Sequence, residues 1–307
     1  MAAVLAMIAL AAGGGAAGAP QRWEPSPGAR WQYQLESSQR GLESTGGIDV
    51  GICQPPASGG SCVRPQVFDI DLYQDGRVSG NDHTVNTAAV NAIHRRGAHA
   101  VCYLSAGTAE RFRPDYGKYL RFDRTHGHSL LGKPFSDRFS NEYWLNLNND
   151  RGQRDFVLRQ MAERTRKCAN AGFDAVEYDV VDAYAQGKRV TGWNISAHTQ
   201  LVYDKALASL AHQNGLSVGL KNDLGQVPRL EPKFDFAVNE QCFQYHECTN
   251  NPSPGYKAFL RDGKPVFQVE YRISPNRFCG DANRLGISSI KKAKNFSLNA
   301  KPWTPCR

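Results

Sequence analysis

The 307-residue chain has no apolar run long enough to cross a bilayer, because a membrane-spanning helix needs about 20 mostly apolar residues in succession. The longest such run covers residues 2–12 and is followed by small residues. Residues 1–20 therefore have the pattern of a secretory signal, although the positive charges that usually precede the apolar run are missing. A disordered Ala/Gly tail is the alternative. We expect no membrane span, a signal-like segment over residues 1–20, and secretion of the remainder.

Sequence signatures of several protein classes are also absent. No GxSxG, Walker or GxGxxG motif stands at a predicted strand–helix junction. The histidines show no metal-ligand spacing and the cysteines form no CxxC pair, so we expect no metal. The formal net charge of +8 is scattered along the chain, and no aromatic residues alternate with basic clusters, so we expect no nucleic-acid partner. We therefore also expect a function that needs no cofactor.

The cysteines number eight, an even count behind a signal-like segment, which indicates disulfide bonds formed in an oxidising compartment. Two pairs could close short loops, a third could hold the C-terminus, and the fourth would then join a strand to a helix. These pairs are Cys53–Cys62, Cys242–Cys248, Cys279–Cys306 and Cys102–Cys168. The spacing alone leaves the connectivity open.

The order of predicted elements indicates a single α/β domain over residues 21–307, because neither an internal repeat nor a long linker interrupts it. Short apolar runs alternate with helical patterns, as in parallel strands joined by crossover helices. Helices are predicted over residues 84–96, 152–171 and 197–214, each followed by glycine. Strands are predicted over residues 31–35, 67–71, 98–104, 143–147, 175–178, 217–220, 234–238 and 265–269. This set favours a (β/α)8 TIM barrel over a doubly wound open sheet.

Carboxylates follow five of the predicted strands, and the C-terminal ends of barrel strands meet at one rim. They are Asp69 and Asp71, then Glu177, Asp179 and Asp182, then Asp223, Glu240 and Glu270. Carboxylates in one partly desolvated cleft raise each other's proton affinity, so one stays protonated while another is ionised. Cleavage of a glycosidic bond needs that division between an acid and a nucleophile or base. Structural roles remain open: Asp71 could pair with arginine, Glu177 with Lys221, and Asp182 could cap a helix.

Seven motifs, in order over residues 30–272, resemble glycoside hydrolase family 114, the endo-α-1,4-polygalactosaminidases. They are WQYQL (31–35), FDIDLYQ (68–74), CYLSAG (102–107), GFDAVEYDVVDAY (172–184), VGLKND (218–223), FAVNEQC (236–242) and VFQVEY (266–271). The resemblance implies a secreted barrel whose catalytic carboxylates are Asp179 and Glu240. It also implies a substrate cleft with Asp71, Tyr103, Ser105, Lys221, Asn222 and Glu270, to which the strand-end pattern adds Glu177 and Asp182. The chain has Tyr178 and Asn146 where the family often has proline and aspartate.

The expected function is endo-hydrolysis of α-1,4-linked galactosamine-containing polysaccharide by a monomeric enzyme, with Asp179 as nucleophile or base and Glu240 as acid. The partly deacetylated polymer is cationic, and an acidic cleft would attract it despite the net charge of +8, because charges beyond a Debye length of about 8 Å are screened. Two alternatives remain, a sugar-binding barrel without catalysis and a hydrolase of another glycan.

Overall fold

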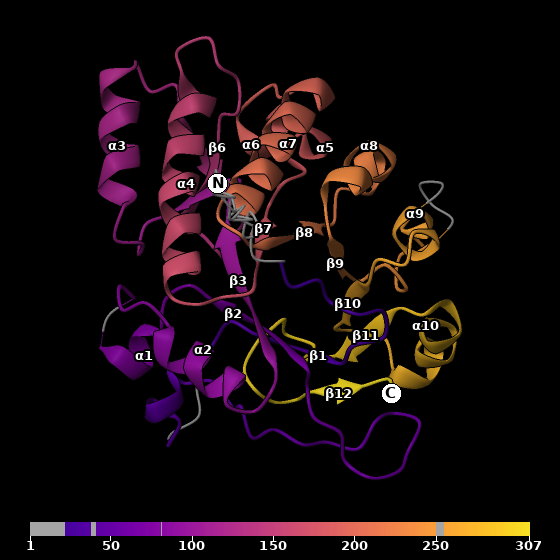
Figure 1. The fold of residues 1–307 in the computed structure, drawn as a ribbon. Helices are drawn as coiled ribbons and strands as arrows, with labels where there is room; N and C mark the ends of the chain where they lie inside the picture. The colour runs from indigo at the N-terminus through magenta and orange to yellow at the C-terminus, as the bar shows by residue number, and fades with distance from the viewer. Residues whose placement is uncertain (1–21, 38–40, 81, 250–254) are drawn as a thin grey trace, which may run out of the picture.

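The computed structural model describes residues 22–37, 41–80, 82–249 and 255–307, so the signal-like segment predicted over residues 1–20 lies outside the described residues. The chain forms a (β/α)8 barrel around a nine-stranded sheet in which every ladder is parallel except the last. In sheet order the strands are β1 Trp31–Gln34, β2 Val67–Asp71, β3 His99–Ser105, β7 Ala175–Asp179, β8 Ser217–Lys221, β9 Phe236–Glu240, β10 Val266–Glu270, β11 Ser288–Lys291 and β12 Thr304–Pro305. The predicted barrel is confirmed (Figure 1).

One predicted barrel strand belongs to a different sheet. The run at 143–147 forms β6 (Glu142–Leu145), which pairs antiparallel with β4 (Thr108–Glu110) and β5 (Leu131–Pro134). We call this three-stranded unit the rim sheet, because β4 follows the C-terminal end of β3 almost directly. In the barrel β3 pairs with β7, and the place of an additional parallel strand is taken by β11. A strand therefore forms close to 143–147 as predicted, but the prediction that it belongs to the barrel was wrong.

Side chains close the seam between the first and last parallel strands. Trp31 Nε1 donates a hydrogen bond to the Ser288 carbonyl at 2.8 Å, across from β1 to β11. Trp303 Nε1 donates to the Trp31 carbonyl at 2.9 Å, and Gln32 Nε2 donates to the Ala300 carbonyl at 2.9 Å. The C-terminal segment thus completes the barrel wall at this seam.

Helices cover the barrel from outside, and all three predicted helices are confirmed, as α2 Thr87–His94, α4 Gln153–Asn170 and α7 Ala197–Gln213. Ser196 caps α7 by accepting a hydrogen bond from the Thr199 N–H at 3.0 Å, as its position in the sequence predicts. The remaining helices are α1 Gly76–Ser79, α3 Tyr116–Thr125, α5 Ala183–Gln186, α6 Lys188–Thr191, α8 Val227–Leu230, α9 Lys257–Arg261 and α10 Cys279–Leu285, with 3-10 turns at Glu43–Thr45, Leu224–Gln226, Glu231–Lys233 and Pro275–Arg277. Among the described residues, no helix has the length and apolar character needed to cross a membrane.

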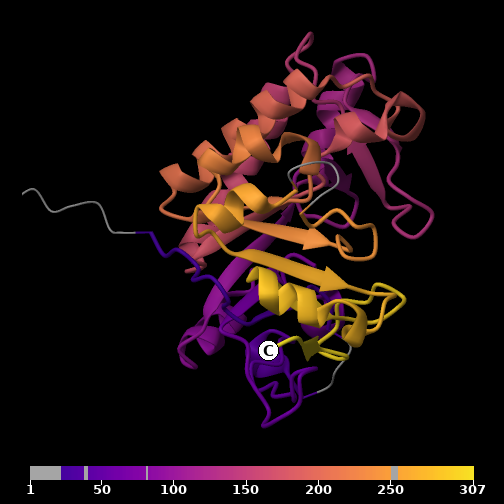
Figure 2. The same cartoon turned by 90° about the vertical axis from the view of Figure 1, so that its right-hand side faces the viewer.

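All eight cysteines form disulfides, in the four pairs that the sequence suggests: Cys53–Cys62, Cys102–Cys168, Cys242–Cys248 and Cys279–Cys306. Cys102–Cys168 joins β3 to α4, and Cys279–Cys306 holds the segment that closes the barrel seam. Cys242–Cys248 closes a short loop directly after β9. Because strands such as β9 and β10 run in the same direction, their C-terminal ends and the loops that follow lie on one side of the barrel (Figure 2).

Candidate active site

A buried lysine lies at the centre of the polar groups on this side of the barrel. Lys221 ends β8 and is only 2% exposed. Its Nζ lies 2.9 Å from Asp179 Oδ1 and 3.4 Å from Glu240 Oε2. It also lies 3.3 Å from Glu177 Oε1. Burial disfavours the ammonium, but the carboxylates of Asp179, Glu240 and Glu177 raise the pKa of Lys221 well above its usual value, so the cation persists.

Asp179, at the end of β7, is held in its ionised form. Burial of the carboxyl opposes ionisation, but the Lys221 ammonium and hydrogen bonds to the carboxylate lower the pKa of Asp179 below its usual value. Tyr103 donates its hydroxyl proton to Oδ2 at 2.8 Å, and the Val180 N–H donates to Oδ1 at 2.8 Å. These donors on neighbouring elements also fix the direction of the carboxylate.

Glu240, at the end of β9, is the more accessible of the two carboxyls that the sequence singles out. Its side chain is 31% exposed, compared with 18% for Asp179. The Tyr271 hydroxyl donates a hydrogen bond to Glu240 Oε1. Because Asp179 Oδ1 and Glu240 Oε2 contact the same nitrogen of Lys221, at 2.9 and 3.4 Å, these two oxygens lie no more than about 6.3 Å apart, which is short of the separation of about 6.5–9.5 Å in inverting glycosidases.

A second layer of polar groups lies beneath Lys221, inside the barrel. Glu177 is 0% exposed and accepts a hydrogen bond from the Tyr33 hydroxyl at 3.3 Å. Burial, followed by repulsion from Glu177, raises the pKa of Asp69 well above its usual value. The protonated form of Asp69 is therefore favoured beside Glu177. The Glu177 carboxyl supports Lys221 from below and does not face the opening.

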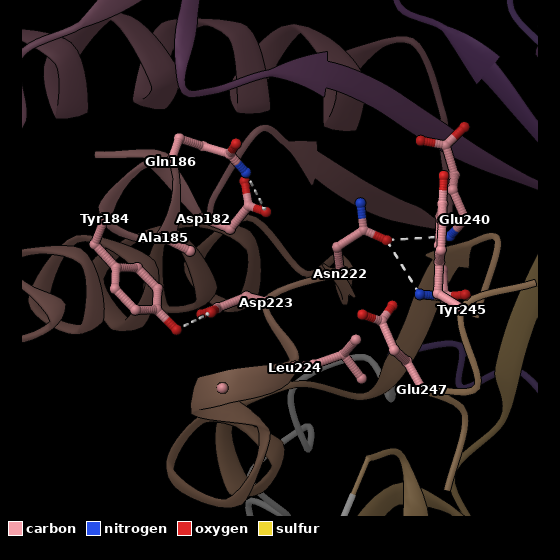
Figure 3. A pocket seen from close by; sticks show the side chains of 12 residues that line it. Asp182, Tyr184, Ala185, Gln186, Asn222, Asp223, Leu224, Glu240, Tyr245 and Glu247 are labelled. Carbon is pink, nitrogen blue, oxygen red and sulfur yellow. Dashed lines mark hydrogen bonds between the residues drawn. The ribbon is translucent and has the colours of Figure 1, made fainter. Parts of the chain in front are cut away.

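The opening is an acidic cleft of about 500 Å³. Its lining residues are Asp182, Tyr184, Ala185, Gln186, Asn222, Asp223, Leu224, Gly225, Asn239, Glu240, Tyr245 and Glu247. Figure 3 shows Asp182, Asp223 and Glu247 around the same space as Asn222 and Glu240. None of the described residues that line the cleft is lysine or arginine. The cleft is therefore suited to a cationic ligand, although the whole chain is basic.

Two features of the cleft suit an amino sugar. Burial, with a contribution from Asp182, raises the pKa of Asp223 to about 8, so a bound cation would favour loss of its proton. Tyr245 is 52% exposed, and an exposed aromatic ring offers an apolar face to a sugar ring. Tyr184 also lines the cleft and donates its hydroxyl proton to Asp223 Oδ1 at 2.9 Å.

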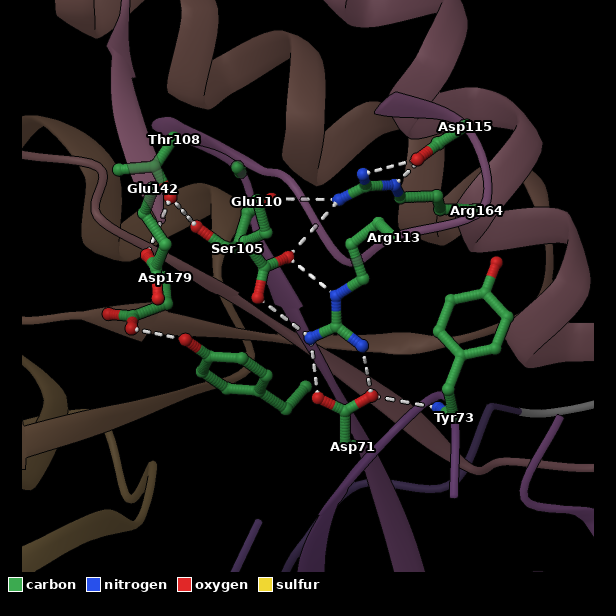
Figure 4. A network of polar contacts seen from close by, with 12 residues as sticks. Asp71, Tyr73, Ser105, Thr108, Glu110, Arg113, Asp115, Glu142, Arg164 and Asp179 are labelled. Atoms are coloured by element: carbon green, nitrogen blue, oxygen red, sulfur yellow. Dashed lines mark hydrogen bonds and ion pairs between the residues drawn. The ribbon is translucent and has the colours of Figure 1, made fainter. Parts of the chain in front are cut away.

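The wall beside Asp179 contains an extended ion-pair network (Figure 4). Arg113 binds Asp71 through two hydrogen bonds, at 2.7 and 2.6 Å, and also binds Glu110 at 2.7 Å. Asp71 thus takes the structural role that the sequence left open. Ser105 is fully buried and is hydrogen-bonded to Thr108.

The two remaining predicted residues differ in their positions. Asn222 lies in the cleft, and its Oδ1 accepts a hydrogen bond from the Glu240 backbone N–H at 3.1 Å. Glu270 is fully buried, and its Oε1 accepts from the N–H groups of Phe243 and Gln244 at 3.0 and 3.2 Å. Burial raises the pKa of Glu270 to about 7. Glu270 anchors the loop after β9 and has no surface that a polymer could contact.

The structure therefore brings part of the predicted set to the opening. Asp179, Glu240, Lys221, Tyr103, Asn222 and Asp182 lie together at or beside the cleft, whereas Glu177, Ser105 and Glu270 are buried and Asp71 is bound by Arg113. Sequence reasoning missed Tyr271, Glu142, Tyr245 and Glu247. The signal for Tyr271 was present, since it follows Glu270 in a motif already quoted, and Glu247 lies in a loop between two cysteines.

Backbone strain concentrates at the ends of the three central strands. Val180 after β7 has φ 60°, Asn222 and Asp223 after β8 have φ 49° and 41°, and Gln241 after β9 has φ 67°. A left-handed conformation is unfavourable for residues with a Cβ, and most of all for a β-branched valine. The Val180 conformation is accommodated by Gly107, because a Cβ at position 107 would lie 1.8 Å from the Val180 carbonyl oxygen.

Substitution Gly107→Ala is expected to lower the free energy of unfolding by roughly 2–4 kcal/mol, because the clash is with backbone and no flexible side chain can move aside. Urea denaturation measures the change. Gly117→Ala in α3 is the matched control, since a Cβ there meets nothing within 4 Å. Equal stability of the two variants would contradict the close approach of Gly107 and Val180.

Comparisons with known proteins fit this geometry. The model of glycoside hydrolase family GH114 matches residues 14–304. The structure of Aspergillus fumigatus Ega3 in complex with galactosamine is similar with a TM-score of 0.67 and 26% identity, over 91% of this chain and 96% of that chain. The glycoside hydrolase domain of PelA from Pseudomonas aeruginosa shares the fold, with a TM-score of 0.51 and 12% identity over 88% of this chain and 96% of that chain. A search among curated proteins gave no match.

Proposed function

The chain belongs to glycoside hydrolase family GH114, and on this basis we propose that it cleaves α-1,4-linked galactosamine-containing polysaccharide internally, with Asp179 and Glu240 as the catalytic pair. One observation carries the assignment: both carboxylates contact the ammonium of a single buried lysine, at 2.9 and 3.4 Å, and Glu240 opens onto an acidic cleft. An amino-sugar substrate is supported by the galactosamine bound to Ega3 and by the carboxylates that line the cleft.

The two carboxylates take different roles. Asp179, whose pKa is lowered against the effect of burial by Lys221, is the nucleophile that attacks the anomeric carbon. Glu240 is more exposed and farther from the ammonium, and it donates a proton to the departing glycosidic oxygen. Water then attacks the glycosyl–Asp179 ester while Glu240 removes a proton from that water, and the anomeric configuration is retained. Lys221 acts as a positioning residue that keeps Asp179 ionised.

The cysteines bear on the compartment in which the enzyme acts. Four disulfides indicate folding in an oxidising compartment, and residues 1–20 have a signal-like composition. The proposed enzyme is therefore secreted and acts on an extracellular polymer.

The test is incubation of the purified protein with partly deacetylated galactosaminogalactan while new reducing ends are counted. Cleavage, with the α-anomer as the first product in a proton NMR time course, supports the proposal. Binding without cleavage identifies a sugar-binding barrel. Cleavage of another polymer only identifies a hydrolase of a different glycan.

Substitution Glu240→Gln is expected to lower kcat on the polymer by about 10²- to 10⁴-fold, because general acid catalysis contributes that much. The loss should be much smaller on an aryl glycoside, whose leaving group needs no proton. Initial rates on both substrates measure the difference. Glu247→Gln is the control, since Glu247 lines the same cleft and is expected to affect mainly KM. An equal loss on both substrates would assign the acid to another residue.

A further inference from the structure

Glu142 lies near Asp179, on a strand outside the barrel sheet. It lies in β6 of the rim sheet and is half-buried. Its Oε2 accepts a hydrogen bond from the Thr108 hydroxyl at 3.1 Å. Figure 4 shows its carboxyl next to that of Asp179, and the two carboxyls repel each other electrostatically. Glu142 is therefore part of the wall beside the proposed nucleophile, apart from the cleft residues in Figure 3.

The carboxyl of Glu142 lacks a cation of its own. The cations of this wall are already matched, with Arg113 bound to Asp71 and Glu110 and Arg164 bound to Asp115. Within the described ranges, no ion pair includes Glu142. This acid therefore differs from the others near it, which have arginine or lysine within contact distance.

The neighbours of Glu142 set its protonation in the free protein. Burial, then repulsion from Glu110 in β4 and from Asp179 in β7, raises the pKa of Glu142 to about 8, although the Thr108 hydrogen bond and Arg113 act in the opposite direction. Below that pH the side chain is mainly a neutral acid. A cation placed beside it would favour the ionised form and drive out the proton.

We propose that Glu142 is a specificity-determining residue that binds the ammonium group of the galactosamine unit attacked by Asp179, and so selects deacetylated units at that position. The inference rests on the proposed function and extends it to the acetylation pattern. In a 2-amino sugar the nitrogen is attached to the carbon next to the anomeric centre. A unit whose anomeric carbon lies against Asp179 therefore carries its amino group close to the same carboxylate, beside which Glu142 lies.

The selectivity has a simple physical basis. An ammonium group forms a charge-assisted hydrogen bond with a carboxylate, which is roughly twice as strong as a bond between neutral groups. In forming it, Glu142 transfers its proton to the solvent and becomes the counterion of the ammonium. An acetamido group is neutral, so it does not stabilise the carboxylate as an ammonium group does.

The first experiment is product analysis on partly acetylated α-1,4-galactosamine polymer by mass spectrometry. Wild type should produce new reducing ends that are galactosamine. Glu142→Gln should lower kcat/KM on the fully deacetylated polymer by about 10- to 100-fold, mainly through KM, and should admit N-acetylgalactosamine at the new reducing end. Glu247→Gln, which removes a cleft carboxyl in the loop after β9, should leave the identity of that sugar unchanged. Unchanged product ends in Glu142→Gln would overturn the inference, whatever the loss of rate.

A binding measurement separates this inference from the proposed function. Calorimetry at pH 7 in two buffers of different ionisation enthalpy counts the protons released when a galactosamine oligomer binds to Glu240→Gln. Glu142→Gln in the same background should release about one proton fewer. Equal proton release would refute the role of Glu142 even if the wild-type protein cleaves the polymer. Failure of the wild-type protein to cleave would refute the proposed hydrolysis, and the proton count would still report on Glu142.

Discussion

Substitution Asp179→Asn is expected to lower turnover of the polymer by at least about 10⁴-fold, because the amide cannot attack an anomeric carbon and residues that act as a catalytic unit show losses of this size or more. The fold should persist. An Asn side chain can still accept hydrogen bonds from Lys221 and from the Val180 N–H through its Oδ1. Reducing-end assays give the rate, and circular dichroism spectra check the fold.

Two further variants sharpen the test of Asp179. Asp281→Asn, at an exposed position on α10, should keep wild-type activity and controls for the loss of a carboxylate. Asp179→Ala leaves room for azide, which should attack an activated α-glycoside from the side where the carboxylate lay and yield the β-glycosyl azide. Normal activity of Asp179→Asn, or an α-glycosyl azide from Asp179→Ala, would assign the nucleophile elsewhere.

Substitution Lys221→Met should abolish activity and also lower the free energy of unfolding at pH 7 by about 3–5 kcal/mol, because removal of one partner leaves buried charges without compensation. Methionine keeps most of the apolar part of the lysine side chain, so the loss of unfolding free energy measures the contribution of the ammonium group. It leaves Glu177 fully buried and Asp179 largely buried without their counterion. Urea denaturation of both proteins measures the difference.

The loss in Lys221→Met should depend on pH with a defined sign. Without the cation, burial and mutual repulsion favour the protonated forms of Asp179 and Glu177, so the folded variant binds more protons than its unfolded chain. Its stability therefore rises as pH falls, and the deficit relative to wild type should be smaller near pH 4 than at pH 8. In the wild-type protein the lowered pKa of Asp179, produced by Lys221 against burial, contributes stability above pH 4 that is lost in acid.

Two variants control for this interpretation. Lys118→Met removes an exposed pair with Glu163 and should change stability by less than about 1 kcal/mol at either pH. Adding Glu177→Gln to Lys221→Met removes one uncompensated charge and should restore part of the stability. A deficit in Lys221→Met that does not vary with pH would show that the lysine contributes by packing alone.

The barrel was predictable because its local patterns are strong. The apolar runs that became β2, β7, β8, β9 and β10 are short, lie between helical segments, and end close to the observed positions. The last parallel strand was not predictable from the same signal. Its sequence, Ser288–Lys291, contains one strongly apolar residue, Ile290, and it is recruited to the sheet by pairing with β10 and by the seam contact with Trp31.

The strand at 143–147, in contrast, was predicted but was assigned to the wrong sheet. Residues 143–147 are apolar enough for a barrel interior, and Trp144 and Leu145 are indeed buried. They are buried in the rim sheet, however, where β6 pairs with β4 and β5. An apolar pattern predicts that one face of a strand is buried, but it does not predict which element covers that face. This error also hid Glu142, which directly precedes the predicted strand at 143–147, because the N-terminal end of a barrel strand lies opposite the rim where the carboxylates meet.

The carboxylates themselves were predictable, whereas their roles were not. Strand ends in a parallel barrel must meet at one rim, which brought Asp179, Lys221 and Glu240 together in the prediction. Whether a side chain at the end of a strand is exposed depends on the direction in which it points. Glu177 points into the barrel and Glu270 binds backbone N–H groups of the next loop, and neither contact leaves a trace in spacing or composition.

The left-handed residues that follow β7, β8 and β9 have a consequence for how quickly the enzyme can work. Val180, Asn222 and Gln241 adopt their unfavourable torsions once, as the chain folds. The dipoles and charges of the site are therefore oriented before a sugar chain binds, and the reaction itself requires little reorganisation of the protein. A redesign that relaxed these three positions with glycine would be expected to make a more pliable protein and a slower catalyst.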